Sequence, residues 1–282
     1  MKVIRSARRM AALARRLQQR RRRIGLVPTM GCLHEGHLSL IRAARTHNDV
    51  VIVTVFVNPL QFGPQEDFKR YPRHLRRDAR FAADAGADIV FAPSVAQIYP
   101  KGFQTSVEVG EMARRWEGEA RPGHFRGVAS VVTILCELTR PTQAYFGQKD
   151  YQQALVIQRL VRDLRLPIRV YVLPTVREPD GLAMSSRNVY LTPPHRRQAA
   201  VLYQALCLAR ERIRARERHA AVIIEEMRRL ISEQPNASID YVAIVDAKTL
   251  EPVWRLRARV AVLLAVWIGT TRLIDNLLVD LS

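Results

Sequence analysis

Two histidines, His34 and His37, lie three residues apart in the segment PTMGCLHEGHLSL, where a short apolar strand is followed by a helix. A helix N-terminus presents unpaired backbone N–H groups and a partial positive charge, which both favour a bound phosphate. Imidazoles placed there can donate hydrogen bonds to phosphate oxygens as charge builds up in a transition state. Zinc would need a third protein ligand, and no nearby Cys or His has a suitable spacing. The pair therefore predicts phosphate handling rather than metal binding.

Two later segments carry polar side chains of the same kind. GQKD, residues 147–150, follows another apolar strand and precedes a helix, so Lys149 is either a phosphate contact or a solvated surface lysine. MSSRN, residues 184–188, groups two hydroxyls, an arginine and an amide. This second group is either a polar turn or helix cap or a mobile loop that binds a triphosphate.

Strands alternate with helices through the first two thirds of the chain. The apolar patterns predict strands at 24–28, 50–57, 88–91, 144–146 and 168–172, and helices at 37–45, 75–85, 126–139 and 150–164. Residues 1–23, which are rich in arginine, are predicted to form a further strand and helix. Such alternation favours a Rossmann-like, doubly wound parallel sheet of the α/β class, which binds ligands at the carboxyl ends of its strands.

The pattern changes near residue 180. Beyond it we predict helices at 194–216 and 220–233, then strands at 241–245, 260–268 and 272–278. Helices followed by an apparently antiparallel sheet indicate a smaller α+β domain. The sequence therefore predicts two domains, residues 1–180 and residues 181–282, and the second would act as a lid.

Composition limits the classes of protein that fit. A chain of 282 residues with 48% hydrophobic and 25% charged residues is typical of a globular protein. The longest apolar run, residues 260–268, is too short to span a membrane. Three scattered cysteines and the lack of a secretory signal predict a cytoplasmic protein. The net charge of +19 allows a nucleic-acid partner, but the arginines are dispersed, so we expect no dedicated nucleic-acid partner.

The motifs together resemble one enzyme family. The segment ending in HEGH is similar to the His-x-Gly-His signature of nucleotidyltransferases. PTMGCLHEGHLSL, FVNPLQFGPQEDFKRYPR, RPGHFRGVASVV, FGQKDYQQ, PTVREPDGLAMSSRNVYL and TRLIDN occur in this order over residues 28–276. In combination they resemble the pantothenate synthetase (pantoate–β-alanine ligase) family over nearly the whole chain.

This resemblance implies a reaction in two steps. ATP and pantoate would form pantoyl adenylate and pyrophosphate, after which β-alanine would displace AMP to give pantothenate. The implied partners are ATP, pantoate, β-alanine and a second copy of the chain in a homodimer. Mg²⁺ would be held by phosphate oxygens and water rather than by a protein cage. The alternatives are transfer of AMP or CMP to another small acceptor and, less consistent with the motifs, RNA binding on a synthetase-like fold.

The resemblance also implies roles for particular residues, with His34, His37 and Lys149 as the catalytic ones. Pantoate would contact Gln61 and Gln153, with Asn58 and Arg121 as secondary members of the pocket, and Gln61 would also contact β-alanine. The implied ATP contacts fall in four segments: Met30, Gly31, Cys32, Leu33, His34, Glu35, Gly36 and His37; Gly147, Gln148, Lys149 and Asp150; Val176; and Met184, Ser185, Ser186 and Arg187.

Cys32 departs from the small residue, such as alanine, that the family pattern leads us to expect. Its thiol is either a tolerated small side chain or an oxidisable group beside the ATP pocket.

Overall fold

The computed structural model describes residues 1–64 and 66–281, which divide into two compact units. Unit 1 comprises residues 1–148 and 152–174, and unit 2 comprises residues 149–151 and 175–282. A boundary between domains at residue 180 stays a prediction.

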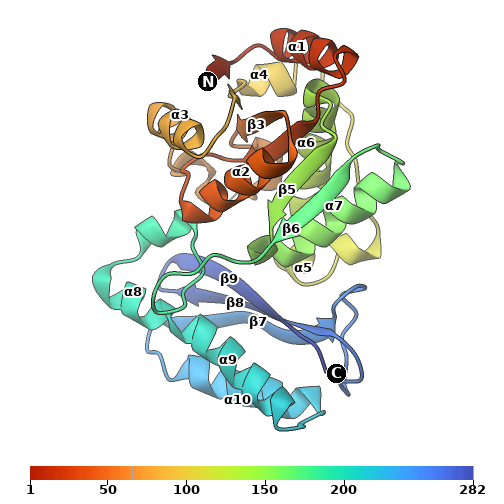
Figure 1. The fold of residues 1–282 in the computed structure, drawn as a ribbon. Coiled ribbons are helices and arrows are strands. Elements are labelled where there is room, and N and C mark those ends of the chain that lie inside the picture. The colour runs from red at the N-terminus through yellow and green to blue at the C-terminus, as the bar shows by residue number, and fades with distance from the viewer. Residues whose placement is uncertain (65, 282) are drawn as a thin grey trace. The chain divides into compact units, whose positions relative to one another are not determined.

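Unit 1 is built on a six-stranded sheet in the order β1-β4-β3-β2-β5-β6, and every pair of neighbours is parallel (Figure 1). The strands are β1 (Lys2–Ile4), β2 (Ile24–Thr29), β3 (Val50–Val55), β4 (Ile89–Phe91), β5 (Gln143–Gly147) and β6 (Arg169–Leu173). The predicted doubly wound parallel sheet is therefore confirmed.

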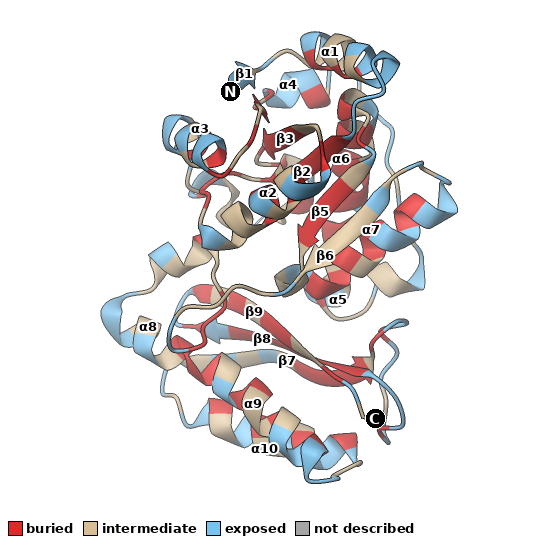
Figure 2. Ribbon diagram, viewed as in Figure 1, coloured by how far each residue is buried: buried red, intermediate tan, exposed pale blue. Residues whose placement is uncertain are grey.

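Helices cover both faces of this sheet. One face packs against α1 (Ala7–Gln19), α6 (His124–Thr139) and α7 (Tyr151–Asp163), and the other against α2 (Glu35–His47) and α3 (Leu75–Asp84). Side chains that are neighbours in a strand point to opposite faces, so Leu26 joins the first layer and Val27 the second. Central strands covered on both faces are largely apolar, and Figure 2 shows β3 and β5 largely buried.

The strand order brings the predicted motif loops to one edge. The chain moves from β2 to β3 on one side and later returns to place β5 on the other side of β2. This reversal is the topological switch point, where ligands bind in open α/β sheets. The loops that follow β2, β3 and β5 carry MGCLHEGH, NPLQFG and GQKD, so all three begin at the carboxyl edge of neighbouring strands.

Unit 2 contains an antiparallel sheet of β7 (Ala237–Asp246), β8 (Val260–Ile268) and β9 (Thr271–Val279). One face of the sheet packs on α9 (Val201–Arg214) and α10 (Ala220–Ser232), which confirms the predicted α+β arrangement. The predicted helix at 194–216 is divided into α8 (Pro193–Ala199) and α9, with Ala200 between them still in a right-handed helical conformation.

Short elements complete the chain. They are the helices α4 (Val95–Ile98) and α5 (Glu117–Ala120), and the 3₁₀ turns η1 (Pro59–Gln61), η2 (Asp67–Lys69), η3 (Glu111–Ala113), η4 (Gln148–Asp150) and η5 (Ser186–Tyr190). Within residues 1–64 and 66–281, no helix is both long enough and apolar enough to cross a membrane.

The close packing of α6 on η1 depends on a glycine. A Cβ atom built on Gly127 would lie 2.3 Å from the carbonyl oxygen of Leu60. We expect Gly127→Ala to lower the free energy of unfolding by about 1–3 kcal/mol, because the η1 backbone must move to admit the methyl group. Urea titration measures this loss. Gly63→Ala is the matched control, because its Cβ atom would meet its nearest neighbour at an ordinary 3.5 Å, and an equal loss there would contradict the packing argument.

Candidate active site

His34 and His37 cap the start of α2 by bonding each other's backbone. His34 is the N-cap residue, and its Nδ1 atom accepts a hydrogen bond from the Gly36 amide at 3.2 Å. The His34 amide in turn donates to Nδ1 of His37 at 3.3 Å. The two rings lie 4.1 Å apart between centroids. The reciprocal bonds form a capping box in which imidazoles take the places usually held by Ser or Thr and Glu.

These bonds assign the proton position on each neutral ring. Since Nδ1 accepts a backbone N–H in both residues, Nδ1 carries no proton, and each neutral imidazole bears its proton on Nε2. Two Nε2–H donors therefore stand at the mouth of α2. Such donors suit an anionic oxygen that gains charge during a reaction.

Gly36 makes this cap possible. A Cβ atom at this position would lie 2.9 Å from Cε1 and 3.0 Å from Nδ1 of His34. Any side chain at residue 36 would therefore push the His34 ring away from the amide that it caps. The glycine in the HEGH segment is explained by this contact.

The expectation of unpaired N–H groups at this helix start was wrong for most of the turn. The Gly31 amide donates to the Thr29 hydroxyl, and the Cys32 and Leu33 amides donate to the carboxylate of Asp78. Most of the amides along the turn are thus satisfied inside the protein, namely those of Gly31, Cys32, Leu33, His34, Gly36, His37 and Leu38. Anion binding at this turn would therefore depend on side-chain donors, such as the imidazoles, rather than on the bonded amides.

Gln61, in the loop after β3, belongs to a second group of bonded side chains. Its side-chain oxygen accepts from Asn58 at 3.1 Å, and its Nε2 atom lies 3.1 Å from the sulfur of Met30. Asn58 is 1% exposed, and it also donates to the Gly127 carbonyl and accepts from the Tyr99 hydroxyl. Asn58 is therefore a buried support for the Gln61 side chain.

Arg121 and His124 fix the backbone of Gln61. Arg121 forms a two-bond ion pair with Glu66, with distances of 3.0 and 2.7 Å, and its NH1 group lies 3.2 Å from Nε2 of His124. The Nδ1 atom of His124 lies 2.8 Å from the Gln61 carbonyl oxygen. Because a carbonyl can only accept, His124 carries its proton on Nδ1 and accepts from Arg121 through Nε2.

The surroundings of His124 keep this ring neutral. Burial lowers the pKa of His124 to about 4, and the positive charge of Arg121 acts in the same direction. A doubly protonated ring would place an N–H group against the Arg121 guanidinium and lose the bond between them. The chain from Arg121 through His124 to Gln61 thus requires the neutral imidazole.

Two consecutive glutamines on α7 have different surroundings. Gln152 is buried: its side chain donates to the carbonyls of Met112 and Arg115 and accepts from the Glu117 amide. Gln153 is half-buried, and its side-chain amide has no hydrogen bond to any residue that the structure describes. Gln153 therefore retains its donors and acceptor for a ligand, as its predicted role requires.

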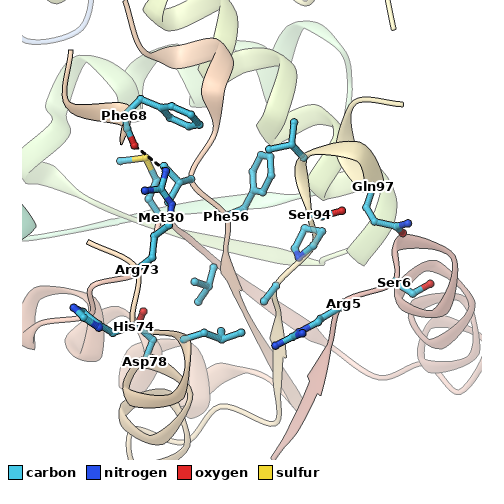
Figure 3. Close-up of a pocket in the computed structure, with 16 residues that line it drawn as sticks. Arg5, Ser6, Met30, Phe56, Phe68, Arg73, His74, Asp78, Ser94 and Gln97 are labelled. Carbon is cyan, nitrogen blue, oxygen red and sulfur yellow. Dashed lines mark hydrogen bonds between the residues drawn. The ribbon is translucent and has the colours of Figure 1, made fainter. Parts of the chain in front are cut away.

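A cavity of about 650 Å³ opens beside this group at the carboxyl ends of β1, β3 and β4 (Figure 3). Met30 lines the cavity and also contacts Gln61. The remaining wall is apolar near Phe56 and basic near Arg5 and Arg73. Such a mixture of apolar surface and a few polar groups is typical of small-molecule sites.

The predicted loop of unit 2 is held at its base by two arginines. Arg177 pairs with Asp275 of β9 through two bonds of 2.6 and 3.0 Å, and Arg196 of α8 pairs with Glu178 and Asp180. Burial raises the pKa of the Asp275 carboxyl, and the bonds from Arg177 oppose this rise. The ion pairs lie on both sides of a short segment: Arg177, Glu178 and Asp180 precede it, and Arg196 follows it. The segment consists of Met184, Ser185, Ser186 and Arg187.

The end of this segment and Lys149 each have an internal partner. Ser185 caps η5 by accepting a hydrogen bond from the Arg187 amide at 3.2 Å, as the helix-cap alternative expects, and a contact of this segment with ATP stays a prediction. Asn276 of β9 donates to the backbone carbonyl of Lys149 at 2.8 Å. The TRLIDN segment therefore bonds both the base of the loop, through Asp275, and the Lys149 backbone, through Asn276.

The described residues do not form a metal centre made of protein ligands. Among them, no three His, Cys, Asp or Glu side chains are grouped as a metal site requires.

Cys32 is buried and holds a left-handed backbone conformation with φ of 50°. Burial does not favour the hypothesis that its thiol is an oxidisable group.

The fold and this geometry define a nucleotide-binding class of α/β protein, with a His-x-Gly-His turn at the switch point of a parallel sheet. The sequence pattern of the family described as pantoate-beta-alanine ligase matches residues 2–278. The chain is 58% identical to a pantothenate synthetase from Moorella thermoacetica over 265 aligned residues. The aligned part is 94% of each chain.

Solved structures agree with this match. A pantothenate synthetase from Thermus thermophilus is similar with a TM-score of 0.94 and 47% identity, over 98% of this chain and 99% of that one. A pantoate-beta-alanine ligase from Francisella tularensis, complexed with beta-gamma ATP and beta-alanine, is similar with a TM-score of 0.81 and 36% identity, over 99% and 97%. The chain belongs to the pantoate–β-alanine ligase family.

Several residues of the site were not predicted from the sequence. Asp78, His124 and Asn276 each bond the backbone of a residue singled out by its motif, whereas Gln152 bonds the backbone of Met112, Arg115 and Glu117. His124 lies in the motif RPGHFRG and Asn276 in the motif TRLIDN, so the sequence motifs could have indicated both residues. Asp78 lies in the arginine-rich helix start LRRDAR, where no pattern distinguished it.

The low pKa of His124 makes stability depend on pH in a specific direction. The unfolded chain takes up the proton near the ordinary value of 6.5, but the folded protein does so at about 4. The free energy of unfolding therefore falls as pH is lowered from about 6.5 to 4, by about 3 kcal/mol in total. His124→Asn retains a donor for the Gln61 carbonyl and cannot titrate. Over the same pH range, we therefore expect the free energy of unfolding of this variant to fall by about 3 kcal/mol less than that of the unmodified protein.

Urea titrations of both proteins between pH 7.5 and 4.5 measure this difference. Parallel pH profiles for the two proteins would contradict a neutral, buried His124.

Proposed function

We propose that the chain is an ATP-dependent ligase that joins pantoate to β-alanine through pantoyl adenylate, giving pantothenate, AMP and pyrophosphate. The observation that carries the proposal is the pair of Nε2–H donors held at the mouth of α2, in a chain of this family. The Francisella tularensis relative complexed with beta-gamma ATP and beta-alanine supports the same pair of substrates.

In the first step, a pantoate carboxylate oxygen forms a bond to the α-phosphorus of ATP, and the bond to the leaving pyrophosphate breaks. Negative charge builds on the phosphate oxygens during this exchange. The Nε2–H groups of His34 and His37 donate to these oxygens, and the cap bonds hold the rings so that little rearrangement is needed. His37, on the helix itself, donates a hydrogen bond from its neutral Nε2–H group to the leaving pyrophosphate and keeps its proton.

In the second step, the β-alanine nitrogen forms a bond to the acyl carbon of the adenylate, AMP leaves with the bonding electron pair, and the amine loses a proton. Gln61 and Gln153 orient the acid, since an amide can donate to a carboxylate and accept from a hydroxyl. Asn58 and Arg121, which were expected to contact pantoate, already have internal partners. We propose that they support Gln61 instead.

Other expectations are retained as part of the proposal. Mg²⁺ would neutralise phosphate charge and be held by phosphate oxygens and water. Contacts of ATP with Lys149, Asp150, Val176 and the 184–187 segment stay predictions. So do a homodimer and a cytoplasmic location.

The half-reactions test the function directly. We expect pyrophosphate release from ATP and Mg²⁺ when pantoate is present without β-alanine, and AMP with pantothenate once β-alanine is added. Mass spectrometry of the products identifies the acyl adenylate and the final amide. Turnover with another acid but not with pantoate would retain adenylation and contradict the substrate, and the absence of ATP turnover with any acid would contradict the proposal.

Variants at the two groups of residues should affect different constants. Losing one transition-state donor typically lowers the rate by about 10²–10³-fold, so we expect His37→Ala to lower kcat for pyrophosphate release by this factor. Gln61→Ala should raise KM for pantoate more than KM for ATP. Pre-steady-state pyrophosphate release measures both, with circular dichroism as the folding control, and unchanged kcat in His37→Ala would remove the role assigned to this ring.

A further inference from the structure

Asp78 of α3 is a buried carboxylate that two backbone donors of one turn share. Its side chain is 1% exposed. Oδ2 accepts from the Cys32 amide at 3.0 Å, and Oδ1 accepts from the Leu33 amide at 2.8 Å. The two bonds link α3 to a turn 45 residues earlier in the chain, immediately before His34.

Backbone amides, rather than a cation, stabilise this carboxylate. In the part of the chain that the structure describes, no lysine, arginine or histidine forms an ion pair with Asp78, although α3 is rich in arginine. The guanidinium groups of Arg77 and Arg80 lie over the ring of Phe81 instead. A buried charge is costly unless it is hydrogen-bonded, so the two amides stabilise Asp78 through charge-assisted bonds.

The turn is shaped to receive this carboxylate. A Cβ atom on Gly31 would lie 2.9 Å from Oδ2 of Asp78 and 3.0 Å from a methyl group of Val55, so the glycine leaves the space that the carboxylate occupies. Cys32, the next residue, has φ of 50°, a left-handed conformation that is unfavourable for residues other than glycine. The strain persists because Asp78 binds the amides on both sides of the Cys32 Cα atom.

We propose that Asp78 is a positioning residue for the two histidines: it fixes the turn that places His34 as the N-cap of α2, and it touches no substrate. Leu33 is joined directly to His34, and its buried side chain anchors it in the core between the sheet and α2. The Leu33 amide is bonded to Asp78 as well, so both the side chain and the backbone of Leu33 are fixed. The backbone nitrogen of His34, which follows directly, is therefore held in one position. Figure 3 shows Asp78 at the start of α3, on the wall of the cavity that Met30 also lines.

The carboxylate has a second consequence for phosphate binding. By accepting from Cys32 and Leu33, Asp78 turns these amides away from any anion at the mouth of α2. Phosphate oxygens there would then depend on side-chain donors such as the Nε2–H groups, which makes the position of the rings important. This step rests on the proposed function, whereas the placement of the rings by Asp78 can be tested without it.

Asp78→Asn is the sharpest substitution, because it preserves size and removes one acceptor. The amide would place an N–H₂ group against one of the two backbone N–H donors, and the turn must shift. We expect kcat for pantoate-dependent pyrophosphate release to fall by about 10²-fold, the cost of misplacing a catalytic group by about 1 Å. KM for pantoate should change little, because Asn58, Arg121 and His124 hold Gln61 independently.

A spectroscopic readout separates positioning from a general loss of stability. Long-range ¹H–¹⁵N spectra report the tautomer of each imidazole, and we expect His34 and His37 to be Nε2–H tautomers in the unmodified protein. Asp78→Asn should give mixed tautomers at both rings and faster hydrogen exchange at the Cys32 and Leu33 amides. Asp84→Asn, the same change on an exposed residue of the same helix, should alter none of these signals.

Asp78→Glu provides a second test if the asparagine variant does not fold. It retains both acceptors and the charge but moves the carboxylate by one methylene, so we expect an intermediate loss of kcat with displaced ring signals. Unchanged tautomers and exchange in a folded Asp78 variant would overturn the proposal, whatever happens to kcat. If the unmodified protein releases no pyrophosphate with pantoate, the proposed function fails, but the tautomer and exchange measurements still decide the role of Asp78.

Discussion

The backbone amides between β2 and α2 impose the constraint on which the rest of the site depends. A loop at the edge of a sheet has no ladder partners, and buried N–H groups that lack partners are destabilising. Side chains therefore complete the turn: Thr29 and Asp78 bond its first half, and the His34 and His37 rings bond its second half. The same bonds that make the turn stable also fix which ring nitrogen carries a proton. Local stability and the orientation of the donors thus have one physical origin.

The fold was predictable because its signals are local and repeated. Continuous apolar strands alternating with amphipathic helices identify a parallel sheet covered on both faces, and the predicted elements differ from the observed ones mainly by a few residues at their ends. Helix 150–164, for example, is observed as Tyr151–Asp163. End residues depend on capping bonds and tertiary contacts, which hydrophobic periodicity does not report. The break at Ala200 and the short 3₁₀ turns were missed for the same reason.

The site was predictable only where a motif marks it. Residue types at the carboxyl ends of neighbouring strands pointed to His34, His37 and Gln61, but the unpaired amides expected from the general behaviour of helix starts are mostly occupied. The supports lie far away in sequence: 45 residues separate Leu33 from Asp78, and 63 separate Gln61 from His124. A single sequence does not show which residues pair, even where one of them, such as His124, stands in a motif. An aspartate among arginines has the pattern of a solvated helix face, and here that aspartate is buried.

The two groups of supports fix two neighbouring loops at one sheet edge by different means. The turn after β2 depends on α3 through Asp78, whereas the loop after β3 depends on α6 through the Gly127 carbonyl and His124. These helices lie on opposite faces of the sheet, and the two networks meet at Met30 and Gln61. The Met30 sulfur beside Gln61 is a weak acceptor and gives a soft contact between them. Mutational effects usually add where sites share no strong partner, so we expect a change in one network to reach the other mainly through the Met30 contact. The proposed acid-binding loop can then vary with little movement of the imidazoles.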